Sequence, residues 1–227
     1  LNQIARPEVN VITVEDPVEY RIPGINQVQV NPKAGLTFAA ALRSILRADP
    51  DVVLVGEIRD QETAQIAIEA ALTGHLVLST LHTNDAPSAI TRLIEMEIEP
   101  FLVGSAIDCV VAQRLARRLC LKCREEYEPT EPEIARFHEP GAGAPPATLY
   151  RAAGCSACSN TGYRGRIALH EIMPVTEDIE RLAVARASSV EIARTAIGHG
   201  MESLIRDGWA KVREGLTTVE ELLRVVK

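Results

Sequence analysis

The sequence predicts an α/β protein organised around a parallel β-sheet. Three short, mainly apolar runs, residues 9–14, 52–55 and 75–81, have the composition of strands that are buried on both faces. Segments with apolar residues at helical spacing separate them, and strands that alternate with helices form parallel sheets with right-handed crossovers. Aromatic residues make up 4% of the chain, so Leu, Ile, Val and Ala must fill the core.

Local signals define the elements between the first two strands. Pro23 and Gly24 predict a turn, and the alternating pattern of residues 25–30 predicts an exposed edge strand or a hairpin arm. Residues 37–48 then show the apolar spacing of an amphipathic helix, with Thr37 as its N-cap.

Two further helices follow the second and third strands. Apolar residues at helical spacing predict one over residues 64–72 and another over residues 86–96. Asn84 or Asp85 can cap the second of these, because their side chains accept hydrogen bonds from the free N–H groups of a first turn.

The second half of the chain is predicted to be largely helical. Residues 100–118 predict one long helix in which Cys109 is a packed thiol, and the Glu-, Pro- and Gly-rich residues 125–148 predict a long loop. After Ile167, glycine punctuation predicts four helices. These are expected at residues 177–186, 190–197, 201–213 and 219–226.

Composition excludes several classes of protein. The net charge of −7 argues against a general nucleic-acid-binding surface. No signal peptide is visible, and no apolar run approaches the roughly 18–20 residues that a membrane span needs. Five cysteines in such a chain fit a metal set and one buried thiol better than disulfides, which favours a cytosolic protein.

Ionisable residues follow each of the three predicted parallel strands. Glu15 and Asp16 follow the first strand, Glu57 the second and His82 the third. In a parallel sheet the carboxyl ends lie along one edge, where open α/β sheets bind their ligands. Any one of these residues could be a solvated loop charge, but three strand ends in succession favour a functional site.

Four of the cysteines form two C-x-x-C pairs with 31 residues between them: Cys120 and Cys123, then Cys155 and Cys158. Two such turns can supply the four thiolates of a tetrahedral Zn²⁺ site, and four protein ligands leave no open position, which indicates a structural role. Two disulfides are the alternative, disfavoured in a cytosolic protein. His138 is a possible rival ligand, but it has no partner at the spacing of a metal knuckle.

Three long motifs resemble those of the type II secretion and type IV pilus assembly ATPases (GspE/PilB type). VITVEDPVEY at residues 11–20 resembles their Asp box, DPDVVLVGEIRD at 49–60 their Walker B motif, and TGHLVLSTLHT at 73–83 their His box. The similarity extends over essentially the whole chain, to DGWAKVREGLTTVEE at residues 207–221.

This resemblance implies a RecA-like ATPase lobe that uses ATP and Mg²⁺. Glu15 would then polarise the attacking water, Glu57 would act on Mg²⁺ or its water, and His82 would sense the γ-phosphate. The residues expected to contact ATP or Mg²⁺ are Asp16, Arg59 and His75. Phosphoryl transfer depends on a metal ion, a positioned water and charge stabilisation, which these groups can supply.

The resemblance also implies an organisation and a setting. Residues 1–118 would be an incomplete ATPase core, residues 119–166 an inserted zinc module and residues 167–227 a C-terminal helical subdomain. The family implies a homo-hexamer that works in the cytoplasm, peripherally at the inner membrane, with an inner-membrane platform protein as its partner. A tetracysteine set also favours an assembly or secretion motor over a retraction motor.

One family feature is missing from the sequence. No G-x-x-x-x-G-K-[ST] phosphate-binding loop occurs in it. We therefore expect a C-terminal fragment that begins after that loop and neither binds ATP tightly nor hydrolyses it. The alternative is a non-enzymatic, zinc-bearing protein-interaction module.

A third possibility is a zinc protein that binds nucleic acid. It would rest on the basic cluster of Arg114, Arg117, Arg118, Lys122 and Arg124 beside the first cysteine pair. An acidic run follows this cluster directly, and aromatic residues on which bases could stack are absent from it, so no nucleic-acid partner is expected.

Overall fold

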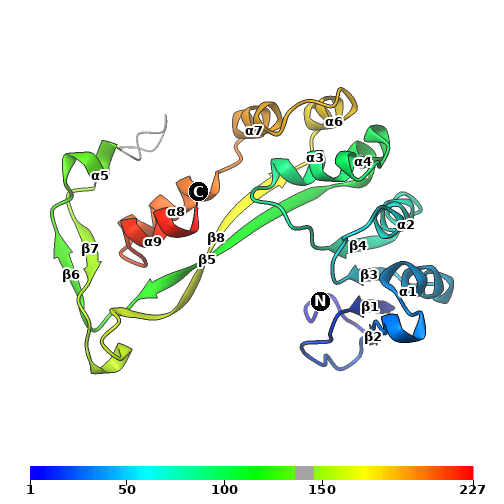
Figure 1. Ribbon diagram of the computed structural model, residues 1–227, viewed down its shortest axis with the longest axis horizontal. Coiled ribbons are helices and arrows are strands. Elements are labelled where there is room, and N and C mark those ends of the chain that lie inside the picture. Colours follow the sequence, from blue (N-terminus) through cyan, green and yellow to red (C-terminus); the bar gives the residue numbers. More distant parts are fainter. Residues whose placement is uncertain (136–145, 227) are drawn as a thin grey trace. The chain divides into compact units, whose positions relative to one another are not determined.

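The computed structural model describes residues 1–135 and 146–226, and the chain divides into two compact units (Figure 1). The first unit combines residues 1–110 with 174–195, and the second combines residues 111–173 with 196–227. None of the helices in the described part of the chain has both the length and the apolar character needed to cross a bilayer.

The first unit contains a four-stranded sheet with the order β2-β1-β3-β4. Its strands are β1 (Val11–Glu15), β2 (Asn26–Gln29), β3 (Val52–Val55) and β4 (Leu76–Ser79). All three pairings are parallel, which confirms the predicted sheet. The weakly apolar β2 is an edge strand, as expected, and its parallel pairing with β1 rules out the hairpin arm.

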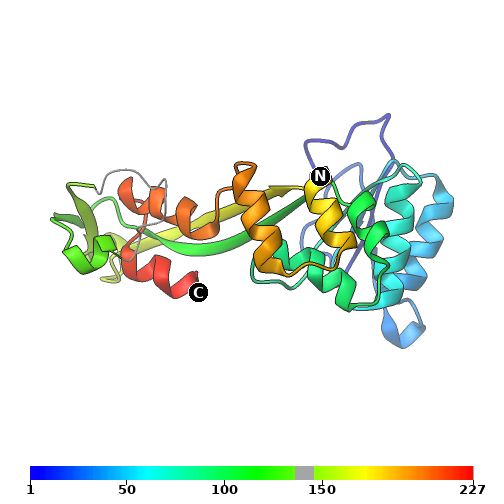
Figure 2. The same cartoon turned by 90° about the horizontal axis from the view of Figure 1, so that it is seen from above.

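Helices form a layer beside this sheet, and the first two of them contact its strands. They are α1 (Phe38–Ile45), α2 (Gln61–Leu72), α3 (Pro87–Glu95), α4 (Pro100–Ala106) and α6 (Glu177–Val184). Helix α1 lies beside α2, α2 beside α4, and α4 beside α6, an arrangement visible from the side in Figure 1 and from above in Figure 2. Short 3₁₀ turns at Pro32–Ala34 and Leu46–Ala48 flank α1.

The predicted capping residues are confirmed. Thr37 Oγ1 accepts a hydrogen bond from the Ala40 N–H at 3.2 Å, at the start of α1. The Asp85 carboxylate accepts one from the Ser88 N–H at 2.8 Å, in the first turn of α3. Each bond satisfies a donor that the helix itself leaves free.

The prediction of one helix over residues 100–118 is wrong. Helix α4 ends at Ala106, Ile107 has extended dihedral angles, and Cys109–Leu119 forms the strand β5. Ala112 and Ala116 are buried between exposed neighbours, as the period of a strand requires. Cys109 is exposed rather than packed within a helix.

In the second unit, β5 pairs with a second long strand. This strand, β8 (Tyr163–Pro174), was not predicted; it extends past Ile167 and ends before the first predicted helix at residue 177. The helices α7 (Ser189–Gly198), α8 (Leu204–Arg213) and α9 (Val219–Val225) come later, close to their predicted positions. With α6 at Glu177–Val184, all four predicted helices are confirmed.

The predicted loop over residues 125–148 also contains regular structure. Strand β6 (Arg124–Tyr127) pairs antiparallel with β7 (Leu149–Ala152), and α5 (Glu131–Ala135) follows β6. A 3₁₀ turn, Ser156–Cys158, comes after β7. His138, the possible rival ligand, lies outside the described residues.

A buried carboxylate fastens α9 to β5. The Glu221 side chain is fully buried and accepts hydrogen bonds from the backbone N–H and the guanidinium of Arg117, both at 2.7 Å, and from Arg224 at 2.6 Å. Burial by itself would raise the pKa of Glu221, but the hydrogen bonds from Arg224 and Arg117 outweigh it and lower the pKa to about 2.

Replacing Glu221 by Gln should destabilise the second unit in a pH-dependent way. The folded-state pKa of Glu221 is below its ordinary value of 4.5, so its contribution is complete above that pH and is lost as the pH falls toward about 2. We expect E221Q to lower the free energy of unfolding by about 3 kcal/mol at pH 7. Denaturant unfolding from pH 7 to pH 2.5 should show this difference shrinking below pH 4.5. The exposed neighbour variant E220Q should change little, and a loss that is independent of pH would contradict the explanation.

Candidate functional site

The carboxyl ends of β1, β3 and β4 are tied together by short hydrogen bonds. The Gly56 N–H donates to the Val14 carbonyl at 2.8 Å, which joins β3 to β1. The Thr80 hydroxyl donates to the Gly56 carbonyl at 2.7 Å, and the Ile58 N–H donates to the Thr80 carbonyl at 3.0 Å. The residues that follow these strands therefore share one edge of the sheet, as the parallel topology predicted.

Gly56 permits this close approach. A Cβ atom at this position would lie 3.2 Å from the Val14 carbonyl oxygen and 3.3 Å from the Cα of Glu15. Both neighbours are backbone atoms of β1 and cannot rotate away. The glycine therefore lets the chain after β3 pass directly beside Glu15.

Glu57 and His82 meet across the ends of β3 and β4. The His82 Nε2 atom lies 3.2 Å from Glu57 Oε2, and the Arg59 Nε atom lies 2.5 Å from the same oxygen. An ionised carboxylate only accepts hydrogen bonds, so both nitrogens act as donors. The Glu57 side chain is 13% exposed and that of His82 is 81% exposed, so the carboxylate is held in place while the imidazole is open to solvent.

Glu15 is held by two neutral donors. Its Oε1 atom accepts a hydrogen bond from the Thr13 hydroxyl at 2.5 Å and one from the Gln27 amide at 2.9 Å. Sequence reasoning missed both partners. Thr13 could have been found from the alternation of side chains along β1, which places Thr13 and Glu15 on one face. Gln27 is the residue of β2 that pairs with Thr13.

The structure does not bring every predicted residue to this edge. Asp16 follows Glu15 directly and is exposed there. His75 precedes β4 and therefore lies at the amino ends of the parallel strands, opposite the carboxyl ends that carry Glu57. There the N–H of the next residue, Leu76, donates to the Asp51 carbonyl. Its ring contacts the Ala70 carbonyl at 2.9 Å and the Thr73 hydroxyl at 3.2 Å. His75 is thus a helix-end contact, remote from Glu57.

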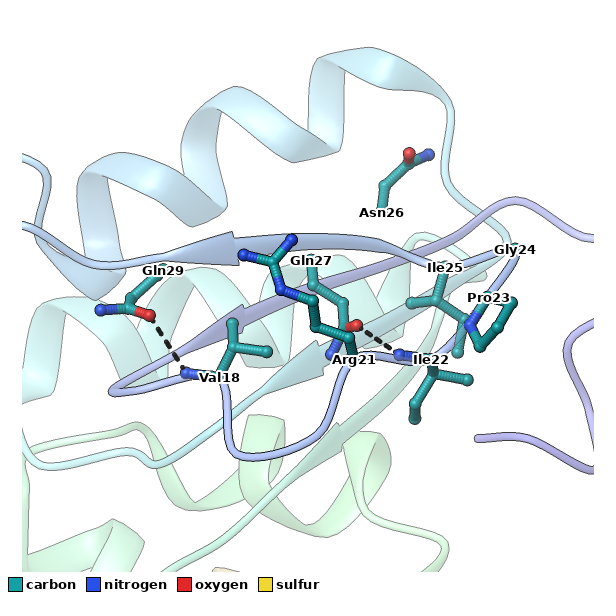
Figure 3. A pocket seen from close by; sticks show the side chains of 9 residues that line it. All are labelled: Val18, Arg21, Ile22, Pro23, Gly24, Ile25, Asn26, Gln27 and Gln29. Atoms are coloured by element: carbon teal, nitrogen blue, oxygen red, sulfur yellow. Dashed lines mark hydrogen bonds between the residues drawn. The ribbon is translucent and has the colours of Figure 1, made fainter.

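A cavity of about 480 Å³ lies between β2 and the preceding loop. Figure 3 shows Gln27 and Gln29 reaching from β2 to this loop, with bonds to the backbone N–H groups of Ile22 and Val18. Gln27 lines the cavity and also donates a hydrogen bond to the Glu15 carboxylate. The cavity therefore borders the Glu15 side of the site.

The four predicted metal ligands come together in the second unit. Their Sγ atoms all lie within 4.8 Å of one another. The separations are 3.9 Å for Cys120–Cys155 and 3.8 Å for both Cys123–Cys158 and Cys155–Cys158. A tetrahedron with metal–sulfur bonds of about 2.3 Å has edges of about 3.8 Å. A disulfide requires about 2.05 Å, so the arrangement fits one metal ion and no cystine.

Backbone N–H groups support the thiolate of Cys158. The N–H groups of Cys155 and Gly162 both donate to its Sγ at 3.2 Å. Burial alone would raise the pKa of Cys158, but these bonds outweigh it and lower the pKa to about 6. Gly162 has φ +75°, and a Cβ there would lie 2.5 Å from that of Ala152, so glycine is required for this geometry.

Comparison with known proteins establishes the family. Residues 1–224 match the family described as type II/IV secretion system protein, and the chain belongs to it. The type IV pilus assembly ATPase PilB of Thermus thermophilus is 54% identical over 223 residues, which are 98% of this chain and 25% of that protein. The type II secretion system ATPase E of Vibrio cholerae is 49% identical over 227 residues, 100% of this chain and 44% of that protein.

Solved structures show the same fold. The pilus retraction motor PilT with bound ADP superposes with a TM-score of 0.67 at 25% identity, over 95% of this chain and 52% of that one. The ATPase DotB of Legionella pneumophila, at 21% identity, shares the fold with a TM-score of 0.64, over 95% of this chain and 51% of that one. The chain spans 25–44% of the length of the two curated relatives described above.

Asp60 lies in the Walker-B-like motif, but the structure gives it a helix-capping role. Its carboxylate accepts hydrogen bonds from the Thr63 N–H at 2.8 Å and the Thr63 hydroxyl at 2.9 Å, at the start of α2. We expect D60A to lower the free energy of unfolding by about 1 kcal/mol, because the first turn loses its cap. D60N keeps an acceptor and should recover most of this loss. Thermal unfolding of both variants tests the assignment, and equal losses would contradict it.

Proposed function

We propose that this chain is the C-terminal part of a secretion or type IV pilus assembly motor ATPase, in which ATP hydrolysis drives extension of a pilus or pseudopilus. The contact between Glu57 and His82 is the observation that carries this proposal, because it joins a largely shielded carboxylate to an exposed imidazole at the carboxyl ends of parallel strands. Glu15 stands on the adjoining strand. We infer that the sheet is the core of a RecA-like lobe.

Each residue has a distinct proposed role. Glu15 polarises the attacking water, and Glu57 acts on Mg²⁺ or a water bound to it. His82 is exposed and can turn its Nε2 donor from Glu57 toward a γ-phosphate. Arg59 offsets the charge of Glu57, while Asp16 borders the site. His75 lies at the other edge of the sheet, so its position does not support a nucleotide contact.

ATP and Mg²⁺ would bind where carboxylate oxygens and an imidazole donor converge. Mg²⁺ would supply charge neutralisation at the phosphates, for which hard oxygen ligands such as those of Glu57 are suited. Residues 1–227 contain no phosphate-binding loop of the form G-x-x-x-x-G-K-[ST], so we propose that such a loop outside these residues completes the site. Without that phosphate-binding loop, residues 1–227 would act as a zinc-bearing protein-interaction module.

We propose that the four cysteines bind one structural Zn²⁺. The support is the set of sulfur separations near 3.8 Å and the N–H groups directed at Cys158. Four protein ligands exclude a catalytic water. In this proposal residues 1–118 serve the ATPase core, residues 119–166 the zinc module and residues 167–227 the C-terminal subdomain.

Family membership supports a proposed setting for the complete motor. The relatives are named as a type IV pilus assembly ATPase and a type II secretion system ATPase. We propose a homo-hexamer in the cytoplasm, held peripherally at the inner membrane by a platform protein. We propose no nucleic-acid partner.

The catalytic roles predict the behaviour of two glutamine variants. With the chain joined to its phosphate-binding loop, E15Q and E57Q should each lower kcat for phosphate release from ATP by about 100-fold or more, because each removes a charge that acts on water or metal. E69Q is a suitable control, since Glu69 lies in the last turn of α2 and away from the site. Wild-type turnover by E57Q would contradict the proposal.

The zinc proposal predicts the metal content of cysteine variants. The purified chain should contain one zinc ion, and C158S should contain almost none and unfold at a lower temperature, because metal binding contributes to folding. C109S is the matched control, since Cys109 is exposed and outside the cluster. Elemental analysis and thermal unfolding are the measurements. A metal-free chain with two disulfides would show the proposal to be wrong.

A further inference from the structure

We propose that Gln27 is a positioning residue that fixes the carboxylate of Glu15 and couples it to the cavity loop, residues 18–25. This inference rests on the proposed role of Glu15 in hydrolysis. Gln27 is half-buried on the edge strand β2 and makes three hydrogen bonds. One goes to Glu15, and two go to the backbone of the loop.

The bonding partners fix the orientation of the Gln27 amide. Its Oε1 atom accepts from the Ile22 N–H at 2.8 Å, a group that can only donate. Its Nε2 atom donates to Glu15 Oε1 at 2.9 Å and to the Tyr20 carbonyl at 3.0 Å, both of which are acceptors. A flipped amide would place oxygen against two acceptors, so only one orientation satisfies all three partners.

This orientation determines which oxygen of Glu15 can meet a water. Thr13 and Gln27 both donate to Oε1, which occupies the two lone pairs of that atom. Within the described part of the chain, Oε2 has no hydrogen-bond partner. The two donors thereby hold the carboxylate so that Oε2 is the oxygen left for a reacting water.

The same amide transmits the position of the loop. Both loop bonds of Gln27 go to backbone atoms, so a movement of the loop would either break these bonds or displace the amide that holds Glu15. Gln29 anchors the same loop by accepting a hydrogen bond from the Val18 N–H at 3.4 Å (Figure 3). Among the described residues, its side chain makes no hydrogen bond with the Glu15 carboxylate. The two glutamines therefore separate loop anchoring from carboxylate positioning.

A double-mutant cycle tests the proposal in the protein that carries this chain with its phosphate-binding loop. Met has nearly the shape of Gln and makes no comparable hydrogen bond, so Q27M removes all three bonds, and Q29M is the matched control for loop anchoring. Phosphate release from ATP gives kcat and KM for Q27M, Q29M, E15Q and the E15Q/Q27M double variant. Thermal unfolding shows that each variant is folded.

We expect Q27M to lower kcat about tenfold with KM for ATP changed by less than about twofold, because a misplaced carboxylate impairs the reaction more than binding. Q29M should stay within about twofold of wild type. In the E15Q background, Q27M should have almost no further effect, since the group that it positions is already disabled. Q27E, which keeps the acceptor for Ile22 but turns an oxygen toward Glu15, should lower kcat at least as much as Q27M.

Three results would overturn the inference: wild-type kcat in Q27M and Q27E, an equal loss from Q27M with and without E15Q, or the same loss in Q29M. They are distinct from failure of the proposed function. Wild-type turnover in E15Q itself would remove the role of Glu15, and the positioning role of Gln27 with it. A normal E15Q defect without a Q27M defect would leave the motor function intact and refute only the positioning.

Discussion

The site depends on the close backbone approach at Gly56. Because no side chain intervenes, the chain leaving β3 can donate a hydrogen bond to β1 and accept one from Thr80 after β4. These bonds hold three strand ends within reach of one another, and they carry Glu15, Glu57 and His82 to one edge. A Cβ atom at Gly56 would press on the backbone of Glu15, so this constraint acts directly on the proposed catalytic group.

The second unit contains a buried ion pair beside its apolar residues, whereas the first is organised around a buried sheet. Its strands form two-stranded pairs, which bury little on their own. Glu221 compensates by binding Arg117 of β5 through both backbone and side chain, and Arg117 in turn covers the Tyr163 ring at 4.1 Å. The four cysteines lie in the turns after β5 and β7 and bring these two turns together, beside a core that includes Leu119, Leu149 and Leu169.

The sequence was sufficient wherever the signal was local. Apolar runs, the Thr37 cap and the C-x-x-C spacing depend on neighbouring residues, and the structure places each as expected. The helix prediction failed after Ala106 because the small and apolar residues there fit the period of a helix or of a strand. Pairing with β8, which is distant in the sequence, makes this segment a strand. Gln27 was missed for a related reason. Its contact with Glu15 depends on the register between β1 and β2, which no short-range pattern specifies.

The two carboxylates at the sheet edge differ in a way that suits different tasks. Glu57 Oε2 contacts Arg59 Nε and His82 Nε2, so this carboxylate has a cation and an exposed imidazole beside it. Glu15 is bound by a hydroxyl and an amide, which orient it without neutralising it. A carboxylate with only neutral donors beside it can act on a water without a competing cation, whereas Glu57 shares one oxygen with a guanidinium and an imidazole. The different environments of the two residues therefore support the proposed division of roles between them.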